Sequence, residues 1–372
     1  MSDLTLVLLA AGTSSRFGLQ VKKQWLRIDH KPLWQFVAQR LEETNLFKKI
    51  IITSSKDDLA FMKHYAAYTF VEGAATRQGS LKNALAEVET EYILVNDIAR
   101  ACINEAFLET ILSQKLSADC IVPYLKASDT IVYDDVTIDR EKVKLIQTPQ
   151  LSRTAILKQA LQNDTEYTDE SSAIVAHGGS RNFVLGDEAA HKITYIHDLK
   201  KLPCLSAPSL DLLSGNGFDV HAFDDGGEMF LGGVKIDSAF GFKAHSDGDV
   251  AIHALIDALL GAAGMGDIGM LFPDNDATYK GIDSKELLKS VVGKLINFGY
   301  CIINVDVTIA AEKPKLGAYK LEMRHTLASI LQIDSSRVNI KATTTEKLGF
   351  IGRGEGVGVL ANANLKYFDW TK

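Results

Sequence analysis

Short apolar runs alternate with amphipathic stretches from Leu4 to about Ile196, and this alternation constrains the fold more than any other feature. LTLVLLA, KKIIITSS, EYILVND and ADCIVPY are typical of buried strands, and PLWQFVAQRLEET and GSLKNALAEV between them are typical of helices. Strands that alternate with helices form βαβ units. We therefore predict the α/β class, with a doubly wound, mostly parallel, Rossmann-like sheet that binds ligands at the carboxyl ends of its strands.

The segment DLKKLPCLSAPSLDLLSG at 198–215 breaks this alternation with two prolines, several serines and a closing glycine. A chain of 372 residues is long for one core, so we predict two domains, 1–211 and 212–372, joined by this linker. A long surface loop inside one domain is the alternative. The second half mixes strand-like runs, including a strand pair around GFDVHAF and FLGGVKI, with long helices, and this order predicts an α+β domain.

Composition narrows the class of protein. A net charge of −7 argues against general binding to nucleic acid or membrane surfaces, so an anion site must be a local cluster of basic residues. The start, MSDLTLVLLAAG, does not resemble a signal peptide and no run reaches the length of a membrane span, so we expect a cytoplasmic protein. We expect reduced thiols, neither disulfides nor a cysteine zinc site, at four widely spaced cysteines: Cys102, Cys120, Cys204 and Cys301.

Two polar patterns in the second half predict a metal site. In GFDVHAF, Asp219 and His221 lie two apart and would share one face of a strand, where the alternative is two solvated side chains on an edge strand. In the apolar helix at 249–264, Asp249 and Asp257 lie one turn to either side of His253 and are candidate partners for a metal-bound imidazole. Asp219, His221 and His253 together would leave one position open, as catalytic zinc sites do.

Two loops have the composition of phosphate sites. KATTTEKLGFIGRGEG at 341–356 combines hydroxyls, basic residues and glycines, and Glu346 there could hold a hard cation such as Mg²⁺. LLAAGTSSRFG and VKKQW follow the first strand, with Arg16, Lys22 and Lys23 supplying positive charge. The stretch after the first strand contains neither GxGxxG nor the glycine-lysine-serine/threonine ending of a P-loop. We therefore predict a triphosphate site of another kind there. A glycine-rich hairpin and a basic connecting loop are the alternatives.

Four stretches of the second half resemble the 2-C-methyl-D-erythritol 2,4-cyclodiphosphate synthase family: GFDVHAF, AHSDGDVAIHALIDALLGAAGMGDIGMLFPD, NVDVTIAAEKPKL and KATTTEKLGFIGRGEG. The resemblance implies that zinc binds Asp219, His221 and His253, and that Mg²⁺ binds Glu346. It implies that His245 and Thr344 steady the transition state. It also implies substrate contacts by Ser246, Asp267, Gly269, Phe272, Asp276, Thr343, Thr345, Phe350 and Arg353, with cytosine in a loop that begins at Ala311. In the implied reaction, the 2-phosphate of the substrate displaces CMP and closes a ring.

The first half resembles the 2-C-methyl-D-erythritol 4-phosphate cytidylyltransferase family in AAGTSSRFG, KKQWLRIDHKPLW, ATRQGSLKNAL, VNDIAR, ASDTI, IDREKVKLIQTPQ, TDESSAI and HKIT. The resemblance implies that Arg16 and Lys23 stabilise the phosphorus centre as CTP reacts. It implies that Arg140 and Lys192 grip the acceptor phosphate and that Asp97 helps to carry Mg²⁺. Cytidine and ribose would meet Ala10, Ala11, Gly12 and Ser80. Without the neighbouring motifs, Arg140 and Lys192 would be interpreted as solvated surface charges.

Three stretches depart from that family's pattern. Ser14 stands where the family usually has glycine and Lys22 where it has proline, and NDIARA at 96–101 replaces HDAARP. Asp97 and Arg100 remain. We therefore still expect CTP to be used, while the departures bear on the acceptor and the turnover rate.

Together the halves predict a bifunctional enzyme of isoprenoid-precursor synthesis, whose two steps are separated by that of a kinase. The resemblances imply a dimer for the first half and a trimer for the second, so we predict a homohexamer. We also hypothesise that the fusion serves co-expression or assembly with the kinase. The alternatives are a cytidylyltransferase for another polyol phosphate, a zinc phosphohydrolase that releases CMP to water, and a non-catalytic nucleotide-sensing scaffold.

Overall fold

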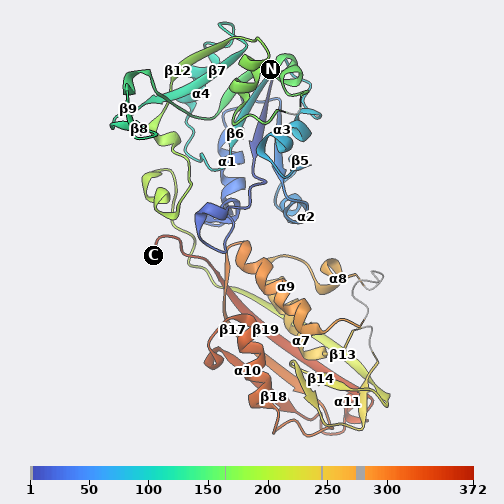
Figure 1. Ribbon diagram of the computed structural model, residues 1–372. Coiled ribbons are helices and arrows are strands. Elements are labelled where there is room, and N and C mark those ends of the chain that lie inside the picture. Colours follow the sequence, from blue (N-terminus) through green and yellow to red (C-terminus); the bar gives the residue numbers. More distant parts are fainter. Residues whose placement is uncertain (1–2, 164, 244–245, 274–280) are drawn as a thin grey trace. The chain divides into compact units, whose positions relative to one another are not determined.

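The computed structural model describes residues 3–163, 165–243, 246–273 and 281–372 (Figure 1). The chain divides into two units: Met1–Pro208 with Trp370–Lys372, and Ser209–Asp369. The expected second domain included the last three residues, but they cluster with the first unit. Trp370 is buried there, and its Nε1 donates a hydrogen bond to the carbonyl oxygen of Arg27 at 2.7 Å.

The first unit is built on an eight-stranded sheet in the order β10–β7–β11–β6–β1–β4–β5, with β12 paired to β7. The pairs β1–β4, β1–β6, β4–β5 and β7–β12 are parallel, whereas β10 and β11 run antiparallel to their neighbours. Every residue of β6 is buried, which requires cover on both faces and confirms the predicted α/β class. The strands are β1 (Leu4–Leu9), β4 (Lys49–Ser54), β5 (Thr69–Glu72), β6 (Tyr92–Asp97), β7 (Cys120–Lys126), β10 (Lys144–Ile146), β11 (Gln150–Arg153) and β12 (Arg181–Leu185).

Helices connect these strands, and several begin at a residue whose side chain accepts a backbone N–H, as Ser55, Thr76, Asn104 and Asp169 do. A short hairpin, β8 (Ile131–Tyr133) with β9 (Val136–Ile138), stands apart from the main sheet. The helices are α1 (Leu33–Glu42), α2 (Lys56–Tyr65), α3 (Arg77–Leu85), α4 (Glu105–Leu112), α5 (Thr154–Ala160) and α6 (Glu170–Ala176), with short 3-10 turns including η1 (Ser15–Phe17), η2 (Lys23–Trp25), η3 (Arg140–Lys142) and η5 (Ile196–Lys201).

The expectation of four reduced cysteines is wrong for one pair. Cys102 and Cys204 form a disulfide, with Cα atoms 5.6 Å apart, whereas Cys120 and Cys301 are free. The two paired cysteines are separated by 102 residues, so their spacing carried no signal of pairing. The fold brings them together because the segment after η5 returns to the loop that follows β6.

The second unit has a five-stranded sheet in the order β16–β13–β19–β17–β18. Helices α7, α9 and α10 contact one another and the sheet, and burial alternates along β17 and β19, as expected when helices cover one face (Figure 1). The bounds are β13 (Leu213–Asp225), β16 (Phe240–Phe242), β17 (Tyr300–Ala310), β18 (Val338–Thr343), β19 (Gly356–Tyr367), α7 (Val250–Ala263), α8 (Ile268–Leu271), α9 (Ser284–Asn297), α10 (Lys320–Leu331) and α11 (Gly349–Gly352).

One predicted pairing differs. GFDVHAF lies in β13, which pairs with β16 and β19, while FLGGVKI forms its own hairpin, β14 (Met229–Leu231) with β15 (Val234–Ile236). Two consecutive glycines, Gly232 and Gly233, both have positive φ, so the chain turns within that short stretch. Among the described residues, no helix is long and apolar enough to cross a membrane.

Helix α7 packs against β13 at a distance that only glycine permits. A Cβ atom on Gly217 would lie 2.0 Å from the carbonyl oxygen of Ala254, and one on Gly215 would lie 2.3 Å from that of Ala258. The helix backbone therefore rests directly on the strand backbone. This close packing sets the spacing between the side chains of β13 and those of α7.

Candidate nucleotide and metal sites

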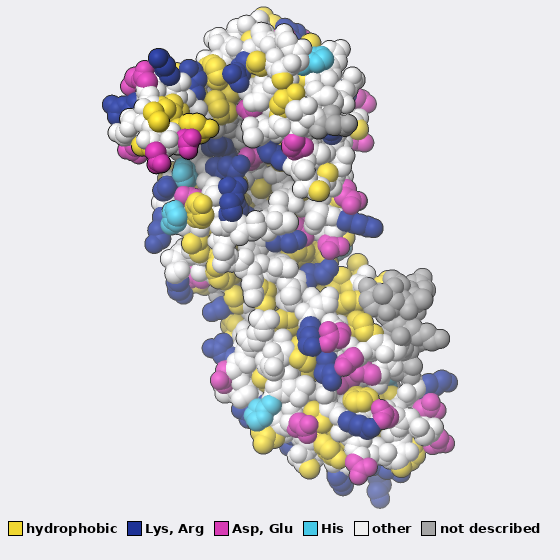
Figure 2. Space-filling view, in the orientation of Figure 1, with side chains coloured by type: hydrophobic (Ala, Val, Ile, Leu, Met, Phe, Trp, Pro, Cys, Tyr) yellow, Lys and Arg dark blue, Asp and Glu magenta, His cyan; other side chains and the backbone are white. Residues whose placement is uncertain are grey.

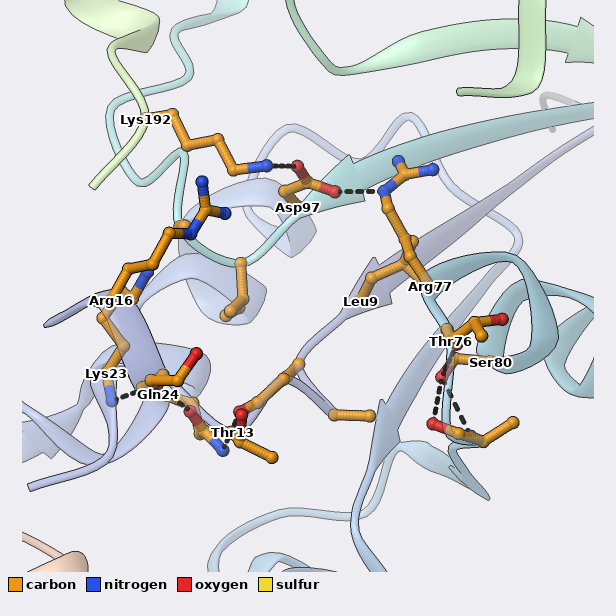
Figure 3. A pocket seen from close by; sticks show the side chains of 18 of the residues that line it. Leu9, Thr13, Arg16, Lys23, Gln24, Thr76, Arg77, Ser80, Asp97 and Lys192 are labelled. Atoms are coloured by element: carbon orange, nitrogen blue, oxygen red, sulfur yellow. Dashed lines mark hydrogen bonds and ion pairs between the residues drawn. The ribbon is translucent and has the colours of Figure 1, made fainter. Parts of the chain in front are cut away.

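A cavity of about 440 Å³ opens in the first unit, where β1 and β6 end (Figure 3). Its position at the carboxyl ends of parallel strands is the one that the βαβ pattern predicts. The residues predicted from the sequence that line it are Ala10, Ala11, Gly12, Arg16, Lys23, Ser80, Asp97 and Lys192. Arg140 is missing from the lining, and so is Lys22, whose amine pairs with Asp58 instead.

The loop after β1 holds its shape through Ser14. This residue has φ of 60°, in the left-handed region that favours glycine, and its hydroxyl accepts the backbone N–H of Lys23 at 3.0 Å. The Nζ of Lys23 donates to the carbonyl oxygen of Ile193 at 2.7 Å. Two segments far apart in sequence thus meet at the amine of Lys23.

Lys23 is electrostatically perturbed. Burial, followed by the positive charges of Lys192 and Arg16, lowers the pKa of its amine to about 8. Arg77 also lines the cavity, so four cations share it with a single lining carboxylate, that of Asp97. This arrangement has the electrostatic character of a site for polyphosphate.

Asp97 ends β6 and lies between two cations. Its carboxylate receives Lys192 Nζ at 2.6 Å and Arg77 Nε at 2.9 Å, while Arg77 Nη1 also donates to the buried Glu170 at 2.6 Å. Burial opposes ionisation of Asp97, but Arg77 and Lys192 outweigh it and hold the pKa of the carboxyl well below its usual range. Arg77 lines the cavity and was missed, although it lies in the quoted stretch ATRQGSLKNAL.

Asn96, which replaces the family's histidine, supports the backbone of Asp97. Its side-chain oxygen accepts from the Thr148 hydroxyl at 3.0 Å, and that hydroxyl accepts the N–H of Asp97 at 3.2 Å. The Asn96 amide donates to the carbonyl oxygen of Arg100 at 3.2 Å. The substitution therefore leaves Asp97 anchored at the end of its strand.

Arg140 lies outside the cavity, in the turn that follows the β8–β9 hairpin. Its Nη1 donates to the carbonyl oxygen of Ser128 at 2.7 Å, and 51% of its side chain is exposed. Val132, Tyr133 and Val136 of the hairpin are also exposed, and Figure 2 shows hydrophobic side chains on this projecting segment. The structure therefore does not bring Arg140 to Lys192 within one chain.

In the second unit, Asp219 and His221 of β13 meet His253 of α7. One ligand atom from each lies within 4.8 Å of the others, and the Oδ2 of Asp219 is 3.3 Å from the Nδ1 of each histidine. Burial opposes ionisation of Asp219, but the two adjacent histidines outweigh it and lower the pKa of its carboxyl. The three side chains form a group that could hold a metal ion.

The predicted carboxylate partners of His253 serve other groups. Asp249 caps the start of α7 by accepting backbone N–H groups, and Asp257 accepts the N–H of Ile268. The Nε2 of His253 instead lies 3.0 Å from the hydroxyl of Ser284, which donates to Asp247. Spacing along one helix could not reveal this partner, since Ser284 begins α9.

The Ser284 contact indicates which nitrogen carries the lone pair when the His253 imidazole is neutral. A hydroxyl has one proton, which Ser284 gives to Asp247, so it accepts the proton of His253 Nε2. The Nδ1 of His253 then presents a lone pair to the Asp219 carboxylate. A cation between these two atoms would remove their repulsion, so the residues present fit a metal centre.

The remaining predicted residues of the second unit lie in three places. Ser246 Oγ is 3.3 Å from His253 Nε2, while Asp267, Gly269 and Phe272 lie at or beside α8. Thr343 ends β18, and the loop after it carries Thr344, Thr345 and Glu346, where Thr344 donates to Glu346 at 3.0 Å. Ala311 joins this loop by a backbone hydrogen bond to Thr343, Phe350 lies in α11, and Arg353 pairs with Glu355. His245 and Asp276 lie outside the described residues.

The first unit has the fold and basic cavity of a nucleotidyltransferase, and the second has the three-ligand group of a metal-dependent enzyme. Residues 4–203 match the 2-C-methyl-D-erythritol 4-phosphate cytidylyltransferase family, and residues 212–366 match the YgbB family.

Relatives match along the full chain. It is 72% identical to a bifunctional enzyme IspD/IspF of Sulfurimonas denitrificans over 100% of this chain and 96% of the relative. It is 56% identical to that of a Sulfurovum species over 100% and 99% of the two chains. The solved structure of the bifunctional IspDF from Campylobacter jejuni has 48% identity, full coverage of both chains and a TM-score of 0.90. The chain belongs to the bifunctional IspD/IspF family, with a cytidylyltransferase domain and a cyclodiphosphate synthase domain of isoprenoid-precursor synthesis.

Proposed function

We propose that this chain performs both family reactions with the side chains described above. The first unit transfers CMP from CTP to 2-C-methyl-D-erythritol 4-phosphate and releases pyrophosphate. The second unit separately cyclises 4-CDP-2-C-methyl-D-erythritol 2-phosphate to the 2,4-cyclodiphosphate and releases CMP. The observation that carries the first assignment is the cavity in which Arg16, Lys23 and Lys192 converge beside Asp97.

In the first reaction, the acceptor phosphate attacks the α-phosphorus of CTP. Arg16 and Lys23 offset negative charge that spreads over the phosphorus oxygens, and Lys192 holds the acceptor phosphate. Ala10, Ala11, Gly12 and Ser80 line the part of the cavity assigned to the nucleoside. Mg²⁺, when bound, supplies further charge neutralisation. Each oxygen of Asp97 accepts one hydrogen bond, from Arg77 or Lys192, and retains a lone pair with which it could hold the ion.

In the second reaction, the attacking phosphate and the leaving CMP belong to one molecule. Holding both ends together supplies much of the acceleration, since well-oriented intramolecular reactions gain roughly 7–11 kcal/mol. Asp219, His221 and His253 would hold Zn²⁺, and Glu346 would hold Mg²⁺; these ions act as Lewis acids on phosphate oxygens. Thr344, on the same loop as Glu346, contacts the phosphates, and His245 is assigned the same task.

One set of assays tests this assignment and its alternatives. With CTP and Mg²⁺, we expect pyrophosphate release that depends on 2-C-methyl-D-erythritol 4-phosphate and is far slower with other polyol phosphates. With the second substrate, we expect CMP and the cyclic diphosphate in equal amounts. A linear product would favour a phosphohydrolase. Nucleotide binding without turnover at either site would favour a sensing scaffold.

The pKa of Lys23 predicts a pH dependence for the first reaction. A lysine is cationic below its pKa, so Lys23 loses its charge as the pH rises through about 8. We expect kcat/KM for CTP, which reports the free enzyme, to fall roughly tenfold per pH unit above that value. The control is Lys23→Arg, which stays charged and should lose this alkaline decline. An identical decline in both proteins would contradict the assignment.

The partner of His253 predicts an effect on metal affinity. Ser284→Ala removes the hydroxyl that accepts the proton of Nε2, so we expect the affinity for Zn²⁺ to fall about tenfold. Competition with a chromophoric chelator measures this without turnover. Ser290→Ala, an exposed position on the same helix, is the control. Unchanged affinity in folded Ser284→Ala would show that the serine does not orient this ligand.

The oligomer is part of the proposal. The exposed hairpin beside Arg140 supports a dimer in which Arg140 reaches the cavity of a second copy. Phe218, Val220 and Leu360 are exposed on β13 and β19, and support a trimer of the second unit. Satisfying both symmetries gives a hexamer, which native mass measurement checks as six chains of 40.7 kDa. We place the protein in the cytoplasm; binding of the intervening kinase would appear as co-sedimentation.

The shared cavity makes a complementation prediction. Arg140→Ala and Lys192→Ala should each lose most cytidylyl transfer, because each removes one cation from the acceptor phosphate. Co-expressed in one cell, the two variants should regain up to about a quarter of the activity, since some cavities then combine two wild-type residues. Cyclisation by the second unit measures the amount of folded protein. The absence of any recovery would rule out donation by a second copy.

A further inference from the structure

The two lysines that line the cavity, Lys23 and Lys192, are each flanked in the sequence by residues that bind a buried aspartate. Asp58 of α2 is 0% exposed and Asp198 of η5 is 4% exposed, and neither lines the cavity. A carboxylate removed from water needs several donors to remain favourable. In both cases those donors flank a cavity lysine.

Asp58 binds the residues on either side of Lys23. It accepts the Nζ of Lys22 at 2.7 Å and the Nε2 of Gln24 at 3.2 Å. The oxygen of the Gln24 amide receives the Ser14 hydroxyl at 3.4 Å, and that hydroxyl accepts the backbone N–H of Lys23. The loop after β1 and the turn that carries Lys23 are thereby connected to α2 through one carboxylate.

Asp198 likewise binds residues on both sides of Lys192 in the sequence. One oxygen accepts the backbone N–H groups of Thr194 and Tyr195, each at 2.9 Å, and the other lies 3.0 Å from His191 Nε2. The residue after Lys192, Ile193, is fully buried and its N–H donates to the carbonyl oxygen of Ala99 at 2.8 Å. The peptide that carries Lys192 therefore has little freedom to move.

The cavity needs such anchors because its cations repel one another. The charges of Lys192 and Arg16 both disfavour the charged form of Lys23 and contribute to its lowered pKa. Asp97 pairs with Lys192 but not with Lys23 or Arg16, so other contacts must hold the segments that carry these cations. Catalysis by fixed charges requires those charges to stay where the phosphates will lie.

We propose that Asp58 and Asp198 are positioning residues of the cytidylyltransferase unit. Asp58 holds Lys23 in place for the triphosphate, and Asp198 holds Lys192 in place for the acceptor phosphate. This inference rests on the proposed roles of the two lysines. It assigns a different substrate dependence to each aspartate, which a general loss of stability would not produce.

The test compares Asp58→Ala and Asp198→Ala with Asp119→Ala, a matched control. Asp119 also binds the backbone, through the N–H of Ser180, but lies outside the cavity lining. We expect Asp58→Ala to raise KM for CTP and lower kcat, and Asp198→Ala to raise KM for the acceptor, each roughly tenfold or more. Asp119→Ala should change the melting temperature without changing either KM. Cyclisation by the second unit reports the folded enzyme.

The asparagine variants sharpen the test. A single amide oxygen can still accept the N–H groups of Thr194 and Tyr195, so Asp198→Asn should retain most acceptor affinity. Asp58→Asn should recover less, because its amide nitrogen would face a second donor, from Lys22 or Gln24. If Asp58→Ala does not fold, Lys22→Ala removes the same ion pair at a partly exposed position and should raise KM for CTP.

The outcomes separate this inference from the proposed function. Lys23→Ala and Lys192→Ala are measured first, and if they show no substrate-specific change, the lysine assignments fail. If they show it and the aspartate variants lower stability with both KM values unchanged, the aspartates are structural only and the inference is overturned. A tenfold change in the wrong substrate would also overturn it.

Discussion

Repulsion among cations is the constraint that organises the first unit. Arg16, Lys23, Arg77 and Lys192 all line one cavity, and a polyphosphate is absent from it until substrate binds. Fixed anions and backbone contacts must therefore keep these cations in place. Asp97 and Glu170 bind Arg77, and Asp97 also binds Lys192. Removing Asp97 would leave Arg77 paired with Glu170 alone and would take this carboxylate away from Lys192.

In the second unit, the candidate metal site depends on close contact between the backbones of a helix and a strand. Gly215 and Gly217 let α7 rest on β13, and this places His253 within reach of Asp219 and His221. A Cβ atom at either glycine would clash with the backbone of α7, so a larger residue there would force helix and strand apart. Orientation of the imidazole then comes from Ser284 at the start of α9. Three elements of secondary structure thus define one group of ligands.

Periodicity in the sequence predicted the features that depend on a single helix or strand. The strands and helices of both units follow from apolar runs, and Asp219 with His221 follows from alternation along β13. Contacts between distant elements left no such signal. The disulfide between Cys102 and Cys204 and the Ser284–His253 contact depend on how segments pack. The motif that contains Arg140 likewise does not show whether this residue contributes to the cavity of its own chain or to that of a second copy.

Two of the departures from the family pattern, Ser14 and Lys22, belong to one hydrogen-bond network. Ser14 adopts a left-handed conformation that costs about 1 kcal/mol without glycine, but its hydroxyl gains the N–H of Lys23, which glycine could not bind. Lys22 lacks the stiffness of proline, but its ion pair with Asp58 fixes the same turn. In each case a side-chain contact replaces a backbone restriction. The contacts of Ser14 and Lys22 both lead to Asp58, directly for Lys22 and through Gln24 for Ser14, so losing this carboxylate should disturb both.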